Sequence, residues 1–128
     1  MPQKLLIVDD DEGMRRLYEK IFTRRGYSIS LAASNIEAKN LLRAGAYGLI
    51  ITEFILPDGT GAELAGLPDA KGERPPIIVV TDFIAPGGLS SFSGDRQFAK
   101  QLNKPFIVEN LISAAQLYLG AAGKNSER

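Results

Sequence analysis

The sequence predicts an α/β fold in which a parallel five-stranded sheet carries helices on both faces. Short, fully apolar runs, typical of strands buried on both sides, recur along the chain, and amphipathic segments with helical spacing lie between them. Strand and helix alternate five times, which favours parallel strands joined by right-handed crossovers. A chain of 128 residues without an internal repeat or linker is long enough for one such domain.

The first half of the chain alternates clearly between the two patterns. Ser34, with Glu37 three residues later, is typical of a capping box at the start of a helix. Gly26 and Gly45 are typical of helix ends. We expect strands at residues 5–8, 27–32 and 49–52, a helix at 12–25, and a second helix between Ser34 and Gly45.

The second half is less regular. Gly66 weakens a short helix expected within residues 61–67, and proline, glycine and serine make any helix within 83–95 short or irregular. Apolar and amphipathic patterns predict strands at 76–80 and 100–103 and a last helix at 108–119 that stops at Gly120. We expect the domain to span residues 1–122, with a polar tail at 123–128.

The overall charge and hydropathy exclude several classes of partner. Fifteen basic and fifteen acidic residues cancel, so the totals give no reason to expect direct binding of nucleic acid or of an anionic membrane. No apolar run approaches the length of a membrane span, and the first residues lack the pattern of a signal peptide. We therefore expect a cytoplasmic protein without membrane contact.

Two missing residue types limit the chemistry. The chain has no cysteine, which excludes disulfides, thiolate nucleophiles and thiolate metal sites. It has no histidine, which excludes an imidazole base and a Ser-His-Asp triad. A functional site must therefore use carboxylates, lysine, hydroxyls and backbone groups, a set that suits Mg²⁺ and phosphate.

Polar side chains follow four of the five expected strands. Asp9 and Asp10 end the first strand, Glu53 the third and Thr81 the fourth, and Lys104 follows the fifth. In a doubly wound sheet these groups meet at the carboxyl edge, where ligands bind. The carboxylates could hold Mg²⁺, and the hydroxyl and the ammonium could hold a phosphoryl group. Each residue taken alone also has a structural explanation, for example the acids as favourable charges at a helix start.

The sequence resembles the receiver domains of response regulators, the CheY-like family, over nearly its whole length. The resemblance lies in Leu6-Ile7-Val8-Asp9-Asp10 with Met14-Arg15-Arg16, in Pro57 and Gly61, in Ile77-Ile78-Val79-Val80-Thr81, and in Lys104-Pro105-Phe106. It implies a flavodoxin-like fold with strand order 2-1-3-4-5, and a module for two-component signalling rather than an enzyme. The implied partners are a sensor histidine kinase or a downstream signalling protein; the oligomeric state stays open.

The resemblance also implies roles for the site residues. Asp9 and Asp10 would hold Mg²⁺, with the carbonyl of Ile55 and the acid at position 53 as further ligands. Thr81 and Lys104 would bind phosphoryl oxygens. The family's phosphoacceptor is an aspartate four residues before the proline, and here that position is Glu53.

Glu53 is one of several departures from the family pattern. Gln101 stands where an aromatic is usual, Asp82 replaces a small residue, and residues 86–94 replace a regular helix. One added methylene moves the carboxylate outward by roughly 1.3–1.5 Å, and phosphoryl transfer is sensitive to an error of about 1 Å. We therefore expect an atypical receiver that acts as a protein-interaction module, with impaired phosphorylation and weakened Mg²⁺ binding.

Two alternatives remain open from the sequence. In the first, the domain is a working Mg²⁺-dependent receiver that takes phosphate from a histidine kinase. In the second, the same fold serves a small Mg²⁺-dependent phosphotransfer enzyme or a flavin-binding domain. The second lacks support, because no glycine-rich phosphate loop follows the first strand and no separate nucleophile is present.

Overall fold

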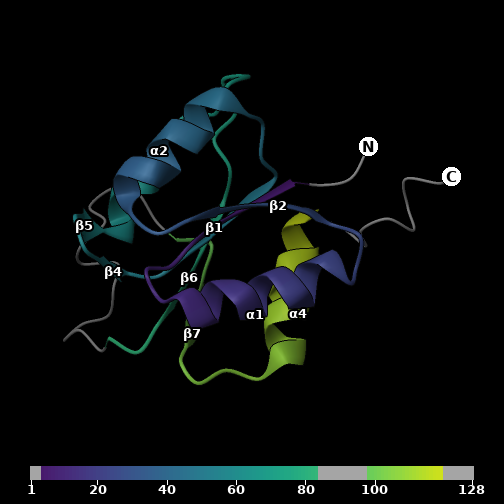
Figure 1. Ribbon diagram of the computed structural model, residues 1–128. Coiled ribbons are helices and arrows are strands. Elements are labelled where there is room, and N and C mark those ends of the chain that lie inside the picture. Colours follow the sequence, from purple (N-terminus) through teal and green to yellow (C-terminus); the bar gives the residue numbers. More distant parts are fainter. Residues whose placement is uncertain (1–3, 84–97, 120–128) are drawn as a thin grey trace, which may run out of the picture.

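The computed structural model describes residues 4–83 and 98–119. Five strands form one parallel sheet in the order β2-β1-β3-β6-β7 (Figure 1). Numbered along the chain without the small hairpin described below, this order is the predicted 2-1-3-4-5, so the predicted fold class is confirmed. The strands are β1 (Lys4–Val8), β2 (Ser28–Ala32), β3 (Leu49–Thr52), β6 (Ile77–Thr81) and β7 (Lys100–Asn103).

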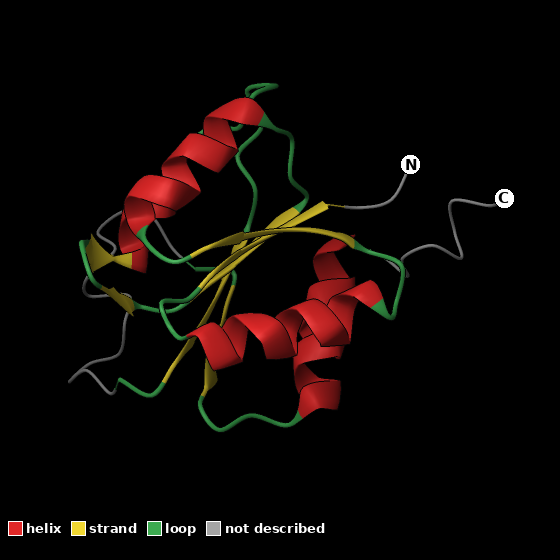
Figure 2. Cartoon of the chain, viewed as in Figure 1, coloured by secondary structure: helices red, strands yellow, loops and turns green. Residues whose placement is uncertain are grey.

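Helices cover both faces of this sheet, as predicted. Figure 2 shows helices on both sides of the sheet. The α-helix α2 (Asn35–Ala44) lies on one side, and the α1–α4 pair, α1 (Glu12–Thr23) and α4 (Val108–Leu119), lies on the other. The alternation of side chains along each strand sends successive residues to opposite faces, so the central strands β1, β3 and β6 each contribute to two separate cores.

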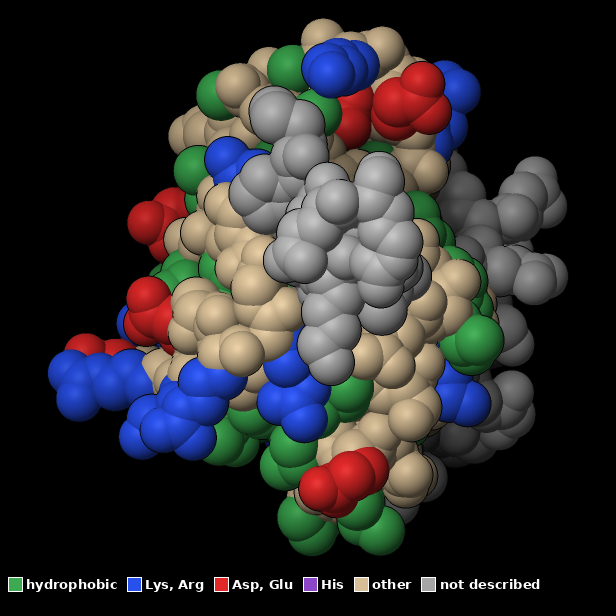
Figure 3. Space-filling view, turned by 90° about the vertical axis from the view of Figure 1, so that its right-hand side faces the viewer, with side chains coloured by type: hydrophobic (Ala, Val, Ile, Leu, Met, Phe, Trp, Pro, Cys, Tyr) green, Lys and Arg blue, Asp and Glu red, His purple; other side chains and the backbone are tan. Residues whose placement is uncertain are grey.

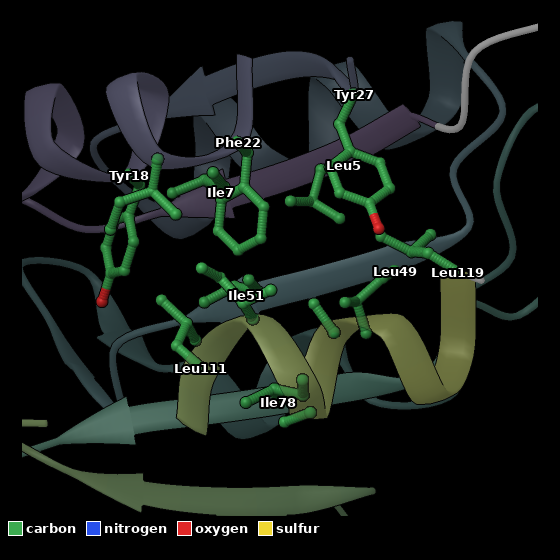
Figure 4. Packing of buried hydrophobic residues seen from close by; sticks show 14 of the residues in the cluster. Leu5, Ile7, Tyr18, Phe22, Tyr27, Leu49, Ile51, Ile78, Leu111 and Leu119 are labelled. Atoms are coloured by element: carbon green, nitrogen blue, oxygen red, sulfur yellow. The ribbon is translucent and has the colours of Figure 1, made fainter. Parts of the chain in front are cut away.

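The larger core lies between the sheet and the α1–α4 pair (Figure 4). Leu5 and Ile7 from β1 and Ile51 from β3 point into it, and Phe22 of α1 meets them. Leu111 of α4 closes the core from the other helix. These five side chains are at most 1% exposed, so close apolar packing fills the middle of this face.

The opposite face carries a smaller core. Leu6 and Ile50 point toward α2, where Ala38 and Leu42 meet them. Beyond α2 the cover is a 3-10 helix, η1 (Gly61–Leu64), which contributes Leu64. The predicted short helix at 61–67 is therefore confined to its first four residues, which agrees with the weakening expected from Gly66.

A small hairpin between β3 and η1 was not predicted. It consists of β4 (Ile55–Leu56) and β5 (Gly59–Thr60), paired antiparallel. Its two-residue strands are too short to give an alternating pattern in the sequence. Gly59 has a φ of 140°, a conformation that side-chain-bearing residues rarely adopt, so a glycine is required at this turn.

The predicted boundaries agree closely with the described elements. Helix α1 ends at Thr23 rather than at residue 25, because Arg25 and Gly26 already form a turn. The capping box is confirmed, since Ser34 Oγ accepts from the Glu37 amide at 3.2 Å. Most of the segment expected to be irregular, as well as Gly120 and the polar tail, lies outside the described residues.

No helix in the described ranges is both long and apolar enough to cross a membrane. Figure 3 shows the face that lies on the right-hand side in Figure 1: both charge signs occur on it, and Lys and Arg side chains gather toward the lower left.

Candidate functional site

The carboxyl edge of the sheet brings together four of the side chains singled out in the sequence. Asp9 follows β1, Glu53 follows β3, Thr81 ends β6 and Lys104 follows β7. Asp9, Glu53 and Thr81 are buried, at 1%, 7% and 0% exposed, and the Lys104 side chain is 18% exposed. Parallel strands end at one edge, which explains how residues so distant in the chain come to share one site.

Lys104 bridges the two buried acids. Its Nζ lies 2.8 Å from Asp9 Oδ2 and 2.9 Å from Glu53 Oε1. Both are charge-assisted hydrogen bonds, the stronger kind in a site shielded from water. The ammonium therefore neutralises part of the charge that burial would otherwise make costly.

The remaining oxygens of the two acids are also engaged. Glu53 Oε2 accepts from the backbone N–H groups of Phe54 at 2.6 Å and Ile55 at 3.2 Å. Asp9 Oδ1 accepts from the Asp11 amide at 2.9 Å. Each carboxylate oxygen thus has a donor within the protein, so the site is held together by its own residues.

Thr81 faces the same edge and is tied to its own loop. Its Oγ1 accepts from the Phe83 amide at 3.1 Å, and its carbonyl accepts from the Lys104 amide at 2.9 Å. The second bond fixes the start of the loop that carries the lysine. Thr81 and Lys104 are therefore linked through the backbone, in addition to facing one site.

Burial and ion pairing shift the acid–base equilibria in the site. Burial raises the pKa of Asp9, even though the bonds from Lys104 and from the Asp11 amide act in the opposite direction. Burial opposes the charge of Lys104, but the bonds to Asp9 and Glu53 outweigh it, and the pKa of Lys104 is raised. Burial also raises the pKa of Tyr18, with a further rise from the nearby charges of Asp9 and Glu53.

The oxygen ligands predicted for Mg²⁺ are only partly assembled. Asp10 is exposed to solvent. Ile55 begins β4, and its amide points to Glu53. Among residues 4–83 and 98–119 no three acids form a group that could hold a metal ion. The residues have the chemistry that Mg²⁺ prefers, but Lys104 and backbone amides occupy the oxygens of Asp9 and Glu53, so an ion binding there would have to displace them.

The other departures noted in the sequence lie around the site. Gln101 on β7 is exposed, and its side chain contacts Asn103 at 3.4 Å rather than the buried acids. Asp82 is also exposed. It does not point its charge into the buried part of the site, so the repulsion that an inward acid would cause is not part of this arrangement.

Sequence reasoning missed several groups that position the acids. Arg15 reaches back from α1 and donates to the carbonyl of Asp9 at 2.7 Å. The Phe54 and Ile55 amides hold Glu53, and no sequence pattern marks a backbone donor. Gly61 was named in the sequence only as part of the family resemblance, and the structure gives it a physical role: a Cβ there would lie 2.6 Å from the Glu53 carbonyl, so only glycine allows the chain to pass so close.

The fold and the site define a doubly wound α/β domain with a lysine-bridged acidic site at the carboxyl edge of its sheet. The chain belongs to the response regulator receiver domain family, whose model matches residues 5–116. It is 30% identical to the response regulator receiver protein CpdR of Brucella abortus, covering 94% of this chain and 99% of that protein. The predicted family is confirmed.

Longer relatives and solved structures agree. The chain is 28% identical to the response regulator MprA of a Mycobacterium species over 93% of its own length, and it spans about half (51%) of that relative. The receiver domain of sensor histidine kinase PA1611 from Pseudomonas aeruginosa is 25% identical, with a TM-score of 0.77 over 94% of this chain and 99% of that domain. That structure is described with a magnesium ion coordinated in its active site cleft.

Membership in the family sets the broad function. Receiver domains are modules of two-component signalling that interact with histidine kinases and downstream effectors, and they typically bind Mg²⁺ in the active site. The roles of the individual residues Asp9, Asp10, Glu53, Ile55, Thr81 and Lys104 in this chain stay predictions.

Proposed function

We propose that this receiver domain is an atypical one that acts as a protein-interaction module without depending on phosphorylation. Its partner is a sensor histidine kinase or a downstream signalling protein, and it acts in the cytoplasm. One observation carries the proposal: Glu53, at the position of the phosphoacceptor, already forms an ion pair with Lys104 at 2.9 Å.

The longer side chain of glutamate explains this contact. It reaches Lys104 with one oxygen while the other accepts two backbone amides. A nucleophilic oxygen has to leave these donors before it can attack a phosphoryl group. In-line transfer also depends on placement, and a shift of about 1 Å can lower the rate by ~10²-fold.

The same arrangement supports weakened Mg²⁺ binding. The Lys104 ammonium supplies positive charge between Asp9 and Glu53. A cation entering this site meets an existing charge and must break two ion pairs, which is costly at buried positions. Asp10, exposed beside the site, remains the carboxylate most available to a metal.

The proposal is tested by incubating the 128-residue chain with acetyl phosphate and Mg²⁺ and measuring its intact mass. We expect no phosphorylated species in the unchanged protein. Glu53→Asp shortens the side chain to the family's acceptor, and it should gain a phosphorylated species that needs Mg²⁺. Glu53→Gln serves as the control, because its amide has no carboxylate oxygen that could take a phosphoryl group.

A saturable, Mg²⁺-dependent gain in mass in the unchanged protein, lost in Glu53→Gln, contradicts the proposal and supports a working phosphoreceiver. A gain that persists in Glu53→Gln indicates another acceptor and equally contradicts it. Binding to a partner should be the same before and after acetyl phosphate treatment, as measured by calorimetry with the purified partner.

A further inference from the structure

Two phenylalanines adjoin the site, one on each of the loops that follow β3 and β6. The Phe54 amide donates to Glu53 Oε2 at 2.6 Å, and the Phe83 amide donates to Thr81 Oγ1 at 3.1 Å. The rings of the same two residues stack, with centroids 5.5 Å apart and planes 17° apart. Each phenylalanine thus holds a site side chain through its backbone and the other phenylalanine through its ring.

Phe54 is confined on several sides. Its side chain is 1% exposed and packs against Val79 of the central strand β6. The Phe98 ring, just before β7, meets it edge-on at 6.2 Å and 89°. The Phe54 carbonyl accepts from the Gly61 amide at 2.7 Å. In a close-packed environment a ring so confined cannot shift without moving its own backbone amide.

We infer that Phe54 and Phe83 are a positioning pair that couples Glu53 to Thr81 across the site. With the rings stacked, the Phe54 amide holds Glu53 where it meets Lys104, and the Phe83 amide holds the hydroxyl of Thr81. Displacing either loop separates the two rings. It thereby weakens the hydrogen bond that the phenylalanine amide donates on the other loop. The inference rests on the proposed function in one respect: it explains how the Glu53–Lys104 contact is maintained.

This pair also supplies an aromatic contact to the Thr81 loop, although Gln101 on β7 stands where the family usually has an aromatic residue. Gln101 is exposed and contacts Asn103, so β7 offers no ring that moves toward Thr81 from position 101. The aromatic contact to the Thr81 loop comes instead from the residue after Glu53. Coupling between the acid and the hydroxyl is therefore direct, through one ring stack, rather than through the edge strand.

Hydrogen exchange of the amides of residues 54 and 83, followed by NMR on the full chain, tests the inference. Leucine at either position removes a ring and keeps its amide. Phe83→Leu should speed exchange at residue 54, and Phe54→Leu should speed exchange at residue 83, because a coupling between two sites is reciprocal. The expected increase is roughly twofold to twelvefold, which corresponds to the interaction of one aromatic pair.

Two further variants separate coupling from general loosening. Phe22→Leu removes a ring from the core under α1. If a lower global stability alone speeds exchange at residues 54 and 83, exchange at these residues will also be faster in this control. Phe83→Tyr keeps the ring and should restore slow exchange at residue 54. Phe83 is only half-buried, so its variants test the inference even where Phe54→Leu fails to fold.

The inference is overturned when Phe83→Leu speeds exchange at residue 54 no more than Phe22→Leu does, or when Phe83→Tyr behaves like Phe83→Leu. Exchange is measured without acetyl phosphate. Phosphorylation of Glu53 therefore contradicts the proposed function and leaves this result unaffected, while a missing coupling overturns only the inference.

Discussion

Under α1 and α4 the sheet is covered by interlocking apolar side chains, whereas the face beyond α2 is closed by η1 and by loops that two carboxylates hold in place. Asp69 accepts from the amides of Tyr47, Lys71 and Glu73. Asp58 accepts from the first two amides of α2, those of Asn35 and Ile36, at 2.9 Å each.

This difference shows how a stretch without an α-helix can still close one face of the sheet. Apolar burial needs an amphipathic element to deliver it, and the chain between β3 and β6 offers only one 3-10 turn. Backbone N–H groups that are buried, or that have no partner at the start of a helix, still need hydrogen-bond acceptors. A carboxylate offers two acceptor oxygens. The stability of the face under α1 and α4 should therefore depend mainly on side-chain volume. The stability of the α2 face, which also has a buried core, should in addition depend on pH.

The largest effect is expected on the apolar face. Phe22 is fully buried and meets Tyr27 edge-on, with ring centroids 5.8 Å apart. Phe22→Ala should lower the free energy of unfolding by about 3–5 kcal/mol, through lost burial and the cavity that remains. Urea unfolding followed by circular dichroism measures it. Leu17→Ala, on the same helix but 39% exposed, is the control, and an equal loss in both variants contradicts the comparison.

On the other face Asp69→Asn should have the next largest effect. The asparagine keeps one acceptor oxygen and brings an NH₂ group to a place where backbone N–H groups converge. Leaving a buried donor unsatisfied costs about 1–3 kcal/mol. Asp82→Asn, at an exposed position, should change the free energy of unfolding by no more than about 0.5 kcal/mol. A loss there comparable to that of Asp69→Asn would contradict a special role for Asp69.

Acid should weaken the carboxylate-held face. Bonds from the Asn35 and Ile36 amides lower the pKa of Asp58, and at Asp69 the three amide bonds outweigh burial and lower its pKa as well. A lowered pKa means that the unfolded state binds more protons. The stabilisation is therefore complete above the unfolded aspartate pKa, about 3.9, and is lost as pH falls through the lower folded value.

Asp58→Asn should accordingly flatten the fall in melting temperature below about pH 4. The raised pKa of Asp9 acts in the opposite direction, because its protonation is favoured in the folded state. Thermal unfolding at a series of pH values compares Asp58→Asn with the unchanged protein. Identical slopes on the acid side would show that the N-terminus of α2 does not depend on the Asp58 charge.

The smallest effect is expected at the ion pair between α2 and η1. Lys39 Nζ lies 2.9 Å from Glu63 Oε1, with side chains 31% and 43% exposed. Exposed pairs of this kind contribute roughly 0–1 kcal/mol. Lys39→Ala and Glu63→Gln, singly and together, give the coupling in a double-mutant cycle. A coupling well above that range would show that this ion pair contributes substantially to holding η1 against α2.

The comparison also separates what could be foreseen from what could not. The strands and the α1 and α4 helices followed from apolar periodicity, because burial imposes a repeat on the sequence. The hairpin and the acceptors Asp58 and Asp69 left no repeat. Asp58 stood in the sequence as one residue after Pro57, and only its contact with the start of α2 gives it a role.

The site divides in the same way. Asp9, Glu53, Thr81 and Lys104 could be placed at one edge because parallel strands end together. The partners of each oxygen could not be predicted, since Lys104 Nζ meets Asp9 across 95 positions of chain, and Phe54 meets Phe83 through rings on separate loops.

By itself the sequence determined the order of the elements, the two apolar faces and the edge at which polar groups gather, because these depend on local periodicity and on the geometry of parallel strands. The tertiary structure alone decided which donor meets which acid. Hydrogen bonds and ring stacks form between residues that only folding brings within a few ångströms, and the backbone amides at Glu53 carry no mark in the residue types.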